Sequence, residues 1–284
     1  MRITRLAVLS LAAASASAAL SQSSAYPISA NFLLDAHPQH PPLSAWNNAG
    51  GRYTLTTLVP GAVLRGYLYP GKDAKAPSIL VFNGAVVGVN DEAGLYRRLA
   101  AMGPTVVAYD LRGTGFSSGN ADVPLLRDDA LKIFDNMASL RPQHKVVIYG
   151  FALGSALAAY VASQRPVAAL VLAAPIASAA EELRVYSGLF GEPYLSAVPS
   201  PEAARDLDVA AMVAKSHAPL LVLQSPADTL IPLAQAREVF AAGAASKQLV
   251  LVPAPTLGEM LIKPASLHAI QTLLAGLSQD AVAH

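Results

Sequence analysis

The chain has 284 residues, of which 53% are hydrophobic and only 14% charged, and its net charge is +1. This length suits a single large α/β unit, and the apolar content is sufficient for one sizeable core. Because no run of lysine or arginine is interleaved with aromatic residues, no nucleic-acid partner is expected. The absence of cysteine excludes disulfides and a lipidated-cysteine anchor.

The first 25 residues have the pattern of an export signal. MRITR carries two arginines, LAVLSLAAA is a short apolar core, and the triplets at 16–18 and 23–25 are small-residue cleavage candidates. A membrane anchor needs about 20 strongly apolar residues, and this core is shorter and diluted by serine and alanine. We expect cleavage at about 18–25 and no membrane span afterwards, hence an exported protein, periplasmic or secreted if the host is bacterial.

An N-terminal arm and a hairpin follow the signal. Residues 26–51 are rich in Pro, Ala, Asn and His and show no period, so we expect an extended arm. RYTLTTL and VLRGYLYP are alternating runs on either side of the Pro60-Gly61 turn signal, and this arrangement predicts a β-hairpin. The folded domain is therefore expected over residues 52–284.

After the hairpin the pattern changes to short apolar runs that alternate with helical patterns. Nearly continuous apolar runs are typical of strands buried on both faces of a parallel sheet, and strand–helix alternation favours a doubly wound α/β fold. The hairpin would add an antiparallel edge. The six runs are SILVFNG, TVVAYD, KVVIYG, VAALVLAAP, PLLVLQS and QLVLVP.

One interval between predicted strands is longer than the others. Residues 176–217 separate VAALVLAAP from PLLVLQS. Two interpretations stay open at this point: a small cap over the carboxyl ends of the strands, where ligands bind in open α/β sheets, or one ordinary crossover helix with loops.

Four segments resemble the α/β-hydrolase family, in its serine-aminopeptidase and monoacylglycerol-lipase-like branch. They occur in the order typical of that family, from about residue 52 to the end. The resemblance implies an α/β-hydrolase fold, with a mostly parallel doubly wound sheet. The segments are VFNGAVVG, AYDLRGTGFSSG, IYGFALGSALA and VLQSPADTLIPLAQA.

The same resemblance assigns the catalytic positions, and two of the three hold aliphatic residues. The nucleophile of G-x-S-x-G falls on Ala152 in GFALG, and a methyl group cannot attack a carbonyl. The acid falls on Asp228 in SPADTLIP, where a helix-capping role is the alternative to orienting a histidine. When Pro253 is aligned with the family's proline, the histidine position holds Leu257.

A rearranged active site is the alternative to an inactive one. The nearest hydroxyl to the elbow is that of Ser155, and the only histidine downstream of His217, apart from the terminal His284, is His268. These two residues are the candidate substitute nucleophile and base. Their simpler interpretation is a first-turn residue of one helix and a surface residue of another.

The oxyanion hole of this family consists of backbone N–H groups, so the loss of side chains does not remove it. By resemblance its donors are the N–H groups of Leu153 and Ala85. Such donors at a helix N-terminus also suit a carboxylate ligand. Asp110, Arg112 and Gly113 correspond to a structural loop of the family, braced by a pair between arginine and a carboxylate. No metal-ligand spacing, P-loop or dinucleotide fingerprint is present, so no metal or cofactor is expected.

Three functional hypotheses follow. The favoured one is an exported, catalytically inactive hydrolase homologue that binds a small acyl or carboxylate ligand or a protein partner. The second is an active serine hydrolase of esters or amides with a rearranged nucleophile and base. The third is a purely structural or scaffold role.

Overall fold

The computed structural model describes residues 41–84, 87–142, 144–179, 181, 185, 207–244 and 246–279. The expected export signal (1–25) and most of the expected arm (26–51) lie outside the described residues. So does the greater part of the interval 176–217, in which a cap was one of two expectations. Among the helices of the described part of the chain, none combines the length and apolarity needed to cross a membrane.

The predicted hairpin is confirmed. Strand β1 (Tyr53–Val59) pairs antiparallel with β2 (Ala62–Tyr69), and Val59 lies opposite Ala62 at the turn. Gly61 makes this tight turn with φ of 72°, a conformation that costs glycine little. Just before β1, the Trp46 indole N–H donates to the Gly66 carbonyl (3.2 Å), which ties the described end of the arm to β2.

The six apolar runs form the parallel part of the sheet, as predicted. The sheet order is β1-β2-β4-β3-β5-β6-β7-β8, with β2 antiparallel to β4 and every later pair parallel. The fold class is therefore the predicted one: a mostly parallel α/β sheet that begins with an antiparallel hairpin. These strands are β3 (Ser78–Phe82), β4 (Val106–Tyr109), β5 (Val146–Phe151), β6 (Ala169–Ala173), β7 (Leu220–Gln224) and β8 (Lys247–Leu251).

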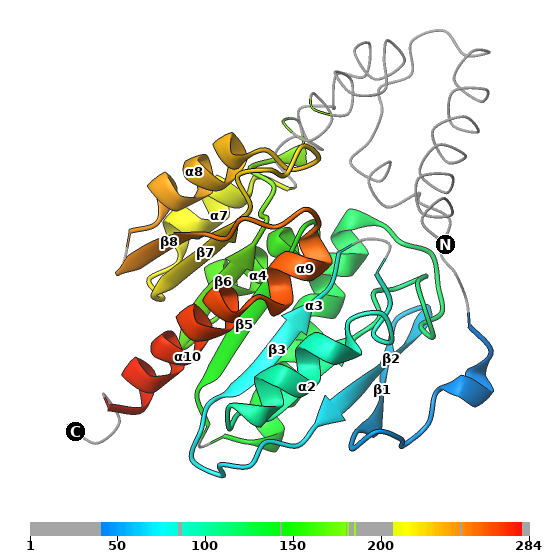
Figure 1. Ribbon diagram of the computed structural model, residues 1–284. Helices are drawn as coiled ribbons and strands as arrows, with labels where there is room; N and C mark the ends of the chain where they lie inside the picture. Colours follow the sequence, from blue (N-terminus) through cyan, green and yellow to red (C-terminus); the bar gives the residue numbers. More distant parts are fainter. Residues whose placement is uncertain are drawn as a thin grey trace, which may run out of the picture.

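Helices cover both faces of the sheet (Figure 1). One layer contains α2 (Ala93–Ala101), α9 (Leu257–Ile262) and α10 (Pro264–Gln279), in which α9 contacts both other helices. The other layer contains α3 (Val123–Leu140), α4 (Gly154–Gln164), α7 (Val209–Lys215) and α8 (Leu233–Ala242), packed in that order. Tyr96 of α2 packs against Tyr69 of β2, with ring centroids 5.5 Å apart and the ring planes tilted by 50°.

Strand β8 and helix α9 differ from the sequence-based expectation, and helix α7 lies in the interval where a crossover helix was one of the two expectations. Strand β8 was expected to be buried on both faces, but it is an edge strand of exposed and half-buried residues. Helix α7 lies in the interval 176–217, capped by the Asp208 carboxylate, which accepts from the N–H of Ala211 (2.8 Å). Helix α9 occupies the segment where the family resemblance placed the histidine loop.

Candidate functional site

The sharp turn between β5 and α4 is the centre of the candidate site. Ala152 adopts φ of 49°, a left-handed conformation that costs a non-glycine residue about 1–2 kcal/mol. Its N–H donates to the Ala173 carbonyl on β6 (3.0 Å), so the neighbouring strand holds the turn in place. This backbone conformation presents residue 152 at the carboxyl edge of the sheet. Within the described residues, the alanine side chain makes no interaction that needs this conformation.

Two glycines make this close approach possible. A Cβ on Gly154 would collide with the carbonyl oxygens of Phe82 and Asn83 at the end of β3. A Cβ on Gly150 would collide with the Gly154 carbonyl oxygen and the Ala158 methyl. The strand–turn–helix geometry of the G-x-S-x-G elbow is thus present, with alanine at its centre.

Ser155 lies one residue inside α4 and is completely buried. Its Oγ donates to the Ala152 carbonyl oxygen at 2.6 Å. This hydrogen bond closes the first turn of the helix and engages the hydroxyl with the backbone. The structure therefore gives Ser155 the geometry of a helix-turn residue.

One of the two expected oxyanion donors can be placed. Leu153 caps α4 with φ of −59°, and within the described residues its N–H has no hydrogen-bond acceptor. It lies at the N-terminus of an eleven-residue helix, where the dipole favours negative charge. Ala85, the other expected donor, lies outside the described residues.

The loop after β3 lies against the elbow. A Cβ on Gly84 would sit 3.4 Å from the Ala152 methyl, which places Gly84 beside the empty nucleophile position. The preceding Asn83 is buried, and its Oδ1 accepts from the Tyr96 hydroxyl of α2 (2.6 Å). Its Nδ2 has no partner in the described part of the chain. Burial raises the pKa of Tyr96 well above its usual value, so this hydroxyl stays protonated and donates.

Asp228 lies beyond the end of β7, with β6 between it and the elbow strand. Two strand spacings separate β5 from β7 by about 10 Å. One oxygen, Oδ1, accepts from the N–H groups of Leu230 and Ile231, both at 2.9 Å. Burial raises the pKa of Asp228, and these two hydrogen bonds oppose the shift. The carboxylate thus has the partners of a turn-capping aspartate.

Leu257 is the first residue of α9 rather than part of a loop. Thr256 caps this helix, because its Oγ1 accepts from the N–H of Glu259 (3.2 Å). The Leu257 side chain is half-buried and packs against the core. A Cβ on the next residue, Gly258, would lie 3.7 Å from the Glu92 carboxylate of α2. An aliphatic helix start therefore stands where the resemblance placed a histidine.

The candidate substitute base is not oriented by any partner. His268 is an exposed residue in α10, eleven positions after Leu257. Among the described residues it makes no hydrogen bond or ion pair to Asp228 or to Ser155. The structure does not join Ser155 and His268 as a nucleophile and its base.

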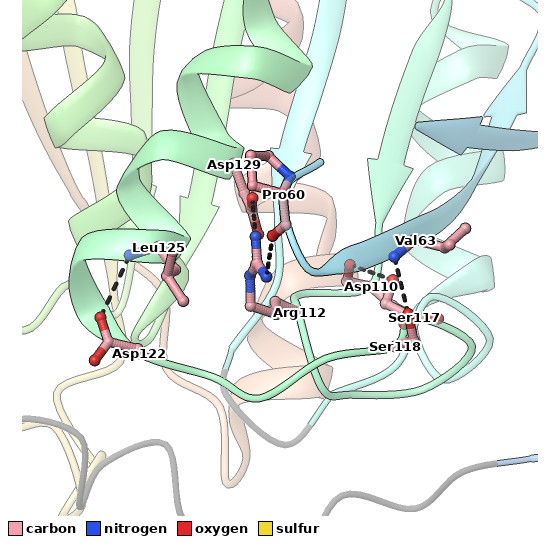
Figure 2. A network of polar contacts seen from close by, with 9 residues as sticks. All are labelled: Pro60, Val63, Asp110, Arg112, Ser117, Ser118, Asp122, Leu125 and Asp129. Carbon is pink, nitrogen blue, oxygen red and sulfur yellow. Dashed lines mark hydrogen bonds and ion pairs between the residues drawn. The ribbon is translucent and has the colours of Figure 1, made fainter. Parts of the chain in front are cut away.

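Figure 2 shows the polar contacts that hold the loop after β4. As predicted, Arg112 is paired with a carboxylate: it forms two hydrogen bonds to Asp129 of α3 (2.8 and 2.7 Å), and both side chains are buried. Its third contact is the Pro60 carbonyl (2.9 Å) at the hairpin turn. The Asp110 carboxylate accepts from the N–H of Val89 (2.7 Å) and that of Phe116 (2.8 Å). These charges hold loops together and are engaged away from the elbow.

The surroundings of the elbow are apolar. A cavity of about 10 Å³ lies beside Leu153, between α3, α4 and the start of α7, and its size is at the limit for one water molecule. Its walls are Val123, Leu126, Leu153, Leu157 and Leu207. Within the described ranges, no three His, Asp or Glu side chains are grouped as metal ligands.

The sequence analysis missed two polar features of this region. The pair of Tyr96 and Asn83 joins a helix to a strand end, and no local pattern reveals such a contact. Tyr149 of β5 is fully buried with no partner for its hydroxyl among the described residues, and burial raises its pKa far above the usual value. The Thr256-x-x-Glu259 capping pattern, by contrast, was a readable signal for α9.

Comparisons with known proteins agree with this geometry. The family model described as "Serine aminopeptidase, S33" matches residues 74–206. An uncharacterized protein of Mycobacterium tuberculosis is 30% identical over 207 residues, which cover 72% of this chain and 71% of that protein. Lysophosphatidylserine lipase ABHD12 of Gallus gallus is 28% identical over 150 residues, 50% of this chain and 36% of that protein.

Solved structures share the fold at low sequence identity. An esterase of Pyrococcus furiosus superposes with a TM-score of 0.65 at 16% identity, covering 85% of this chain and 99% of that one. Est1E from Butyrivibrio proteoclasticus, solved with ferulic acid bound, gives 0.64 at 16% identity over 81% of this chain and all of that one. From the elbow, the strand order and these relatives together, the chain belongs to the α/β-hydrolase family, in its serine-aminopeptidase-like branch.

Proposed function

We propose that this protein is an exported, catalytically inactive member of the α/β-hydrolase family that binds a small acyl or carboxylate ligand, or a protein partner, at the elbow. The observation that carries the proposal is Ala152 in a left-handed turn. The backbone that presents a nucleophile is retained, while the side chain there is a methyl group that cannot form an acyl intermediate.

The ligand class follows from the chemistry around this turn. The N–H of Leu153 at the start of α4 has no acceptor among the described residues, and it offers a hydrogen bond and a partial positive charge to an anionic oxygen. The neighbouring walls are aliphatic side chains. A carboxylate or acyl carbonyl matches this donor, and a short apolar group matches the aliphatic surroundings, although the 10 Å³ cavity itself holds no more than a water molecule. Export rests on the N-terminal pattern of residues 1–25.

Loss of catalysis is supported at the second position as well. Leu257 stands at the position expected for the base, and it is the first residue of a helix. The Oδ1 atom of Asp228 accepts hydrogen bonds from two backbone N–H groups. Removal of a serine triad costs on the order of 10⁶ in turnover. A protein under selection for hydrolysis would not carry hydrocarbon at both positions.

The alternative is an active serine hydrolase with a rearranged site, favoured by the lipases and esterases among its relatives. It requires Ser155 as nucleophile. In the structure the Ser155 hydroxyl is buried and donates to the Ala152 carbonyl, so the helix turn would have to open before it could react.

Hydrolysis of p-nitrophenyl acetate and butyrate by the purified protein separates the two. We expect no turnover above the rate in buffer for the parent chain, for Ala152→Ser alone and for Leu257→His alone. The double variant, Ala152→Ser with Leu257→His, restores the nucleophile and base, and a gain confined to it supports the assignment of both positions. Turnover by the parent chain that is lost in Ser155→Ala would overturn the proposal.

A further inference from the structure

A second cavity lies away from the elbow, between the turn before β1, the end of β2 and helix α2. Its volume is about 260 Å³, and its walls are Gly51, Tyr69, Pro70, Lys72, Arg97 and the Ala100–Ala101 pair. Most of these residues are exposed, whereas Tyr69 and Ala100 are buried and form the base of the wall. The cavity is thus open to solvent on one side.

The cavity and the elbow lie at opposite ends of the sheet. Tyr69 is paired with Val106 at the amino end of β4, and Gly71 packs against Gly103 and Pro104, which precede that strand. The elbow follows the carboxyl end of β5, which is parallel to the rest of the sheet beyond β2. A ligand here would not touch the residues of the candidate functional site.

Two cations line the cavity, and neither is neutralised. In the described part of the chain, Lys72 and Arg97 form no hydrogen bond and no ion pair, and no carboxylate is among the wall residues. The adjacent Asp73 is not a wall residue, and its Oδ1 accepts from the N–H of Lys75 (2.8 Å). The cavity therefore carries two positive charges that have no ion-pair partner among the described residues, in a chain whose net charge is only +1.

The turn at one side of the cavity adds backbone donors. Gly50 and Gly51 have φ of 65° and 76°, and among the described residues neither N–H has an acceptor. Arg97 extends toward this turn, since its Nη1 lies 3.6 Å from where a Cβ on Gly50 would be. The Arg97 guanidinium and the Lys72 ammonium thus line one small cavity, and the glycine turn borders it through Gly51.

We propose that this cavity binds a phosphate group, either of a small soluble phosphate ester or of an anionic lipid headgroup. Arginine and lysine together, without a carboxylate, favour an oxyanion of more than one charge, and guanidinium matches phosphate oxygens in a planar, bidentate manner. The volume admits a phosphate with a short substituent and is below the usual range for drug-sized ligands. Binding at this cavity does not depend on the proposed ligand binding at the elbow, because the two sites share no residue.

Titration calorimetry on the full chain tests the proposal with sn-glycerol 3-phosphate as the probe and chloride at matched ionic strength as the blank. We expect saturable binding that Arg97→Gln and Lys72→Gln each weaken at least tenfold. The matched control is Arg98→Gln, which removes the same charge from the next residue of α2 but lies outside the cavity. It should change the affinity less than twofold.

Vesicle flotation distinguishes the two sources of phosphate. The vesicles contain phosphatidylcholine alone or with one-third phosphatidylglycerol. If the protein floats with the mixed vesicles in an Arg97-dependent way and does not bind the soluble ester, the ligand is a lipid headgroup. If it binds the soluble ester and does not float with the mixed vesicles, the ligand is a soluble phosphate ester. Equal losses in Arg97→Gln and Arg98→Gln, or no binding in either assay, would overturn the proposal. The three side chains are exposed, so the variants should keep the parent's thermal unfolding midpoint.

Discussion

At position 152 an alanine holds a backbone conformation that suits glycine or a constrained functional residue. Left-handed φ in a non-glycine residue is a strain that persists only where the surroundings impose it. Two contacts impose the strain here: the hydrogen bond from the Ala152 N–H to the Ala173 carbonyl, and the tight packing of Gly154 on the end of β3. The strain is therefore a property of the inherited scaffold, and no side-chain chemistry at residue 152 uses it.

This strain predicts the effect of removing one methyl group. Ala152→Gly should raise the free energy of unfolding by about 1 kcal/mol, because glycine adopts positive φ without the penalty. Ala275→Gly, on the exposed side of α10, is the control and should lower it by about 1 kcal/mol. Urea denaturation of both variants measures these changes, and destabilisation by Ala152→Gly would show that the turn is not strained.

Asp228 makes a pH-dependent contribution whose sign follows from its raised pKa. The native state binds this proton more tightly than the unfolded state does, so stability falls as the pH rises from the ordinary value of 3.8 through the native pKa. The variant Asp228→Asn lacks this dependence of stability on pH. Its side-chain oxygen can still accept from the N–H groups of Leu230 and Ile231. We expect the variant to be slightly more stable than the parent at pH 7, with the difference lost below pH 3.8.

Urea unfolding of the two proteins between pH 3 and pH 7 checks this expectation. A variant that is less stable than the parent at pH 7 would mean that the bonds from Leu230 and Ile231 to a charged oxygen outweigh its burial. The pKa of Asp228 would then lie below the ordinary value, as in a carboxylate whose hydrogen bonds dominate its desolvation.

At the scale of elements, the loop after β4 is held by buried charges as well as by the apolar contacts of Leu111 and Phe116. Arg112 connects three segments: its own loop, the hairpin turn at Pro60 and helix α3 (Figure 2). The pair with Asp129 is buried and bidentate, so removal of one partner leaves an isolated charge in the interior. The loop next to the elbow depends on this pair for its position.

Asp129→Ala should therefore lower the free energy of unfolding by about 3–5 kcal/mol. Helix α3 offers a matched control, since Asp135 forms the same bidentate pair with Arg165 at the surface. Asp135→Ala should cost less than about 1 kcal/mol, because water screens an exposed pair. Denaturant unfolding compares the two, and similar costs would contradict the structural role given to Arg112.

Most elements were predictable because each strand is a short apolar run between turn signals. The position of β8 at the edge was not, since its run resembles those of the central strands and only the strand order exposes it. Helix α9 was missed because the family resemblance led to a histidine loop there, although the Thr256-x-x-Glu259 pattern indicates a helix start. At the site, alanine at 152 and leucine at 257 were readable from the sequence. The contact between Tyr96 and Asn83 was not, because it joins a helix and a strand end.

At the scale of the whole molecule, one core supports two chemically different ends. The carboxyl end of the sheet carries the elbow, with an apolar lining and the Leu153 N–H, which has no acceptor in the part of the chain that the structure describes. The amino end carries the cavity with Lys72 and Arg97. The buried apolar residues form one core cluster, which includes Tyr69 and Ala100 at the cavity and Leu153 at the elbow.

The most direct test of this account is labelling of the purified protein with a fluorophosphonate, which reacts covalently with activated serines, followed by mass spectrometry of the intact chain. We predict no mass increase for the parent protein, and an increase of one adduct for the double variant Ala152→Ser with Leu257→His under the same conditions. One adduct on the parent chain, mapped to Ser155 or to any other serine, would contradict the claim that the nucleophile has been lost.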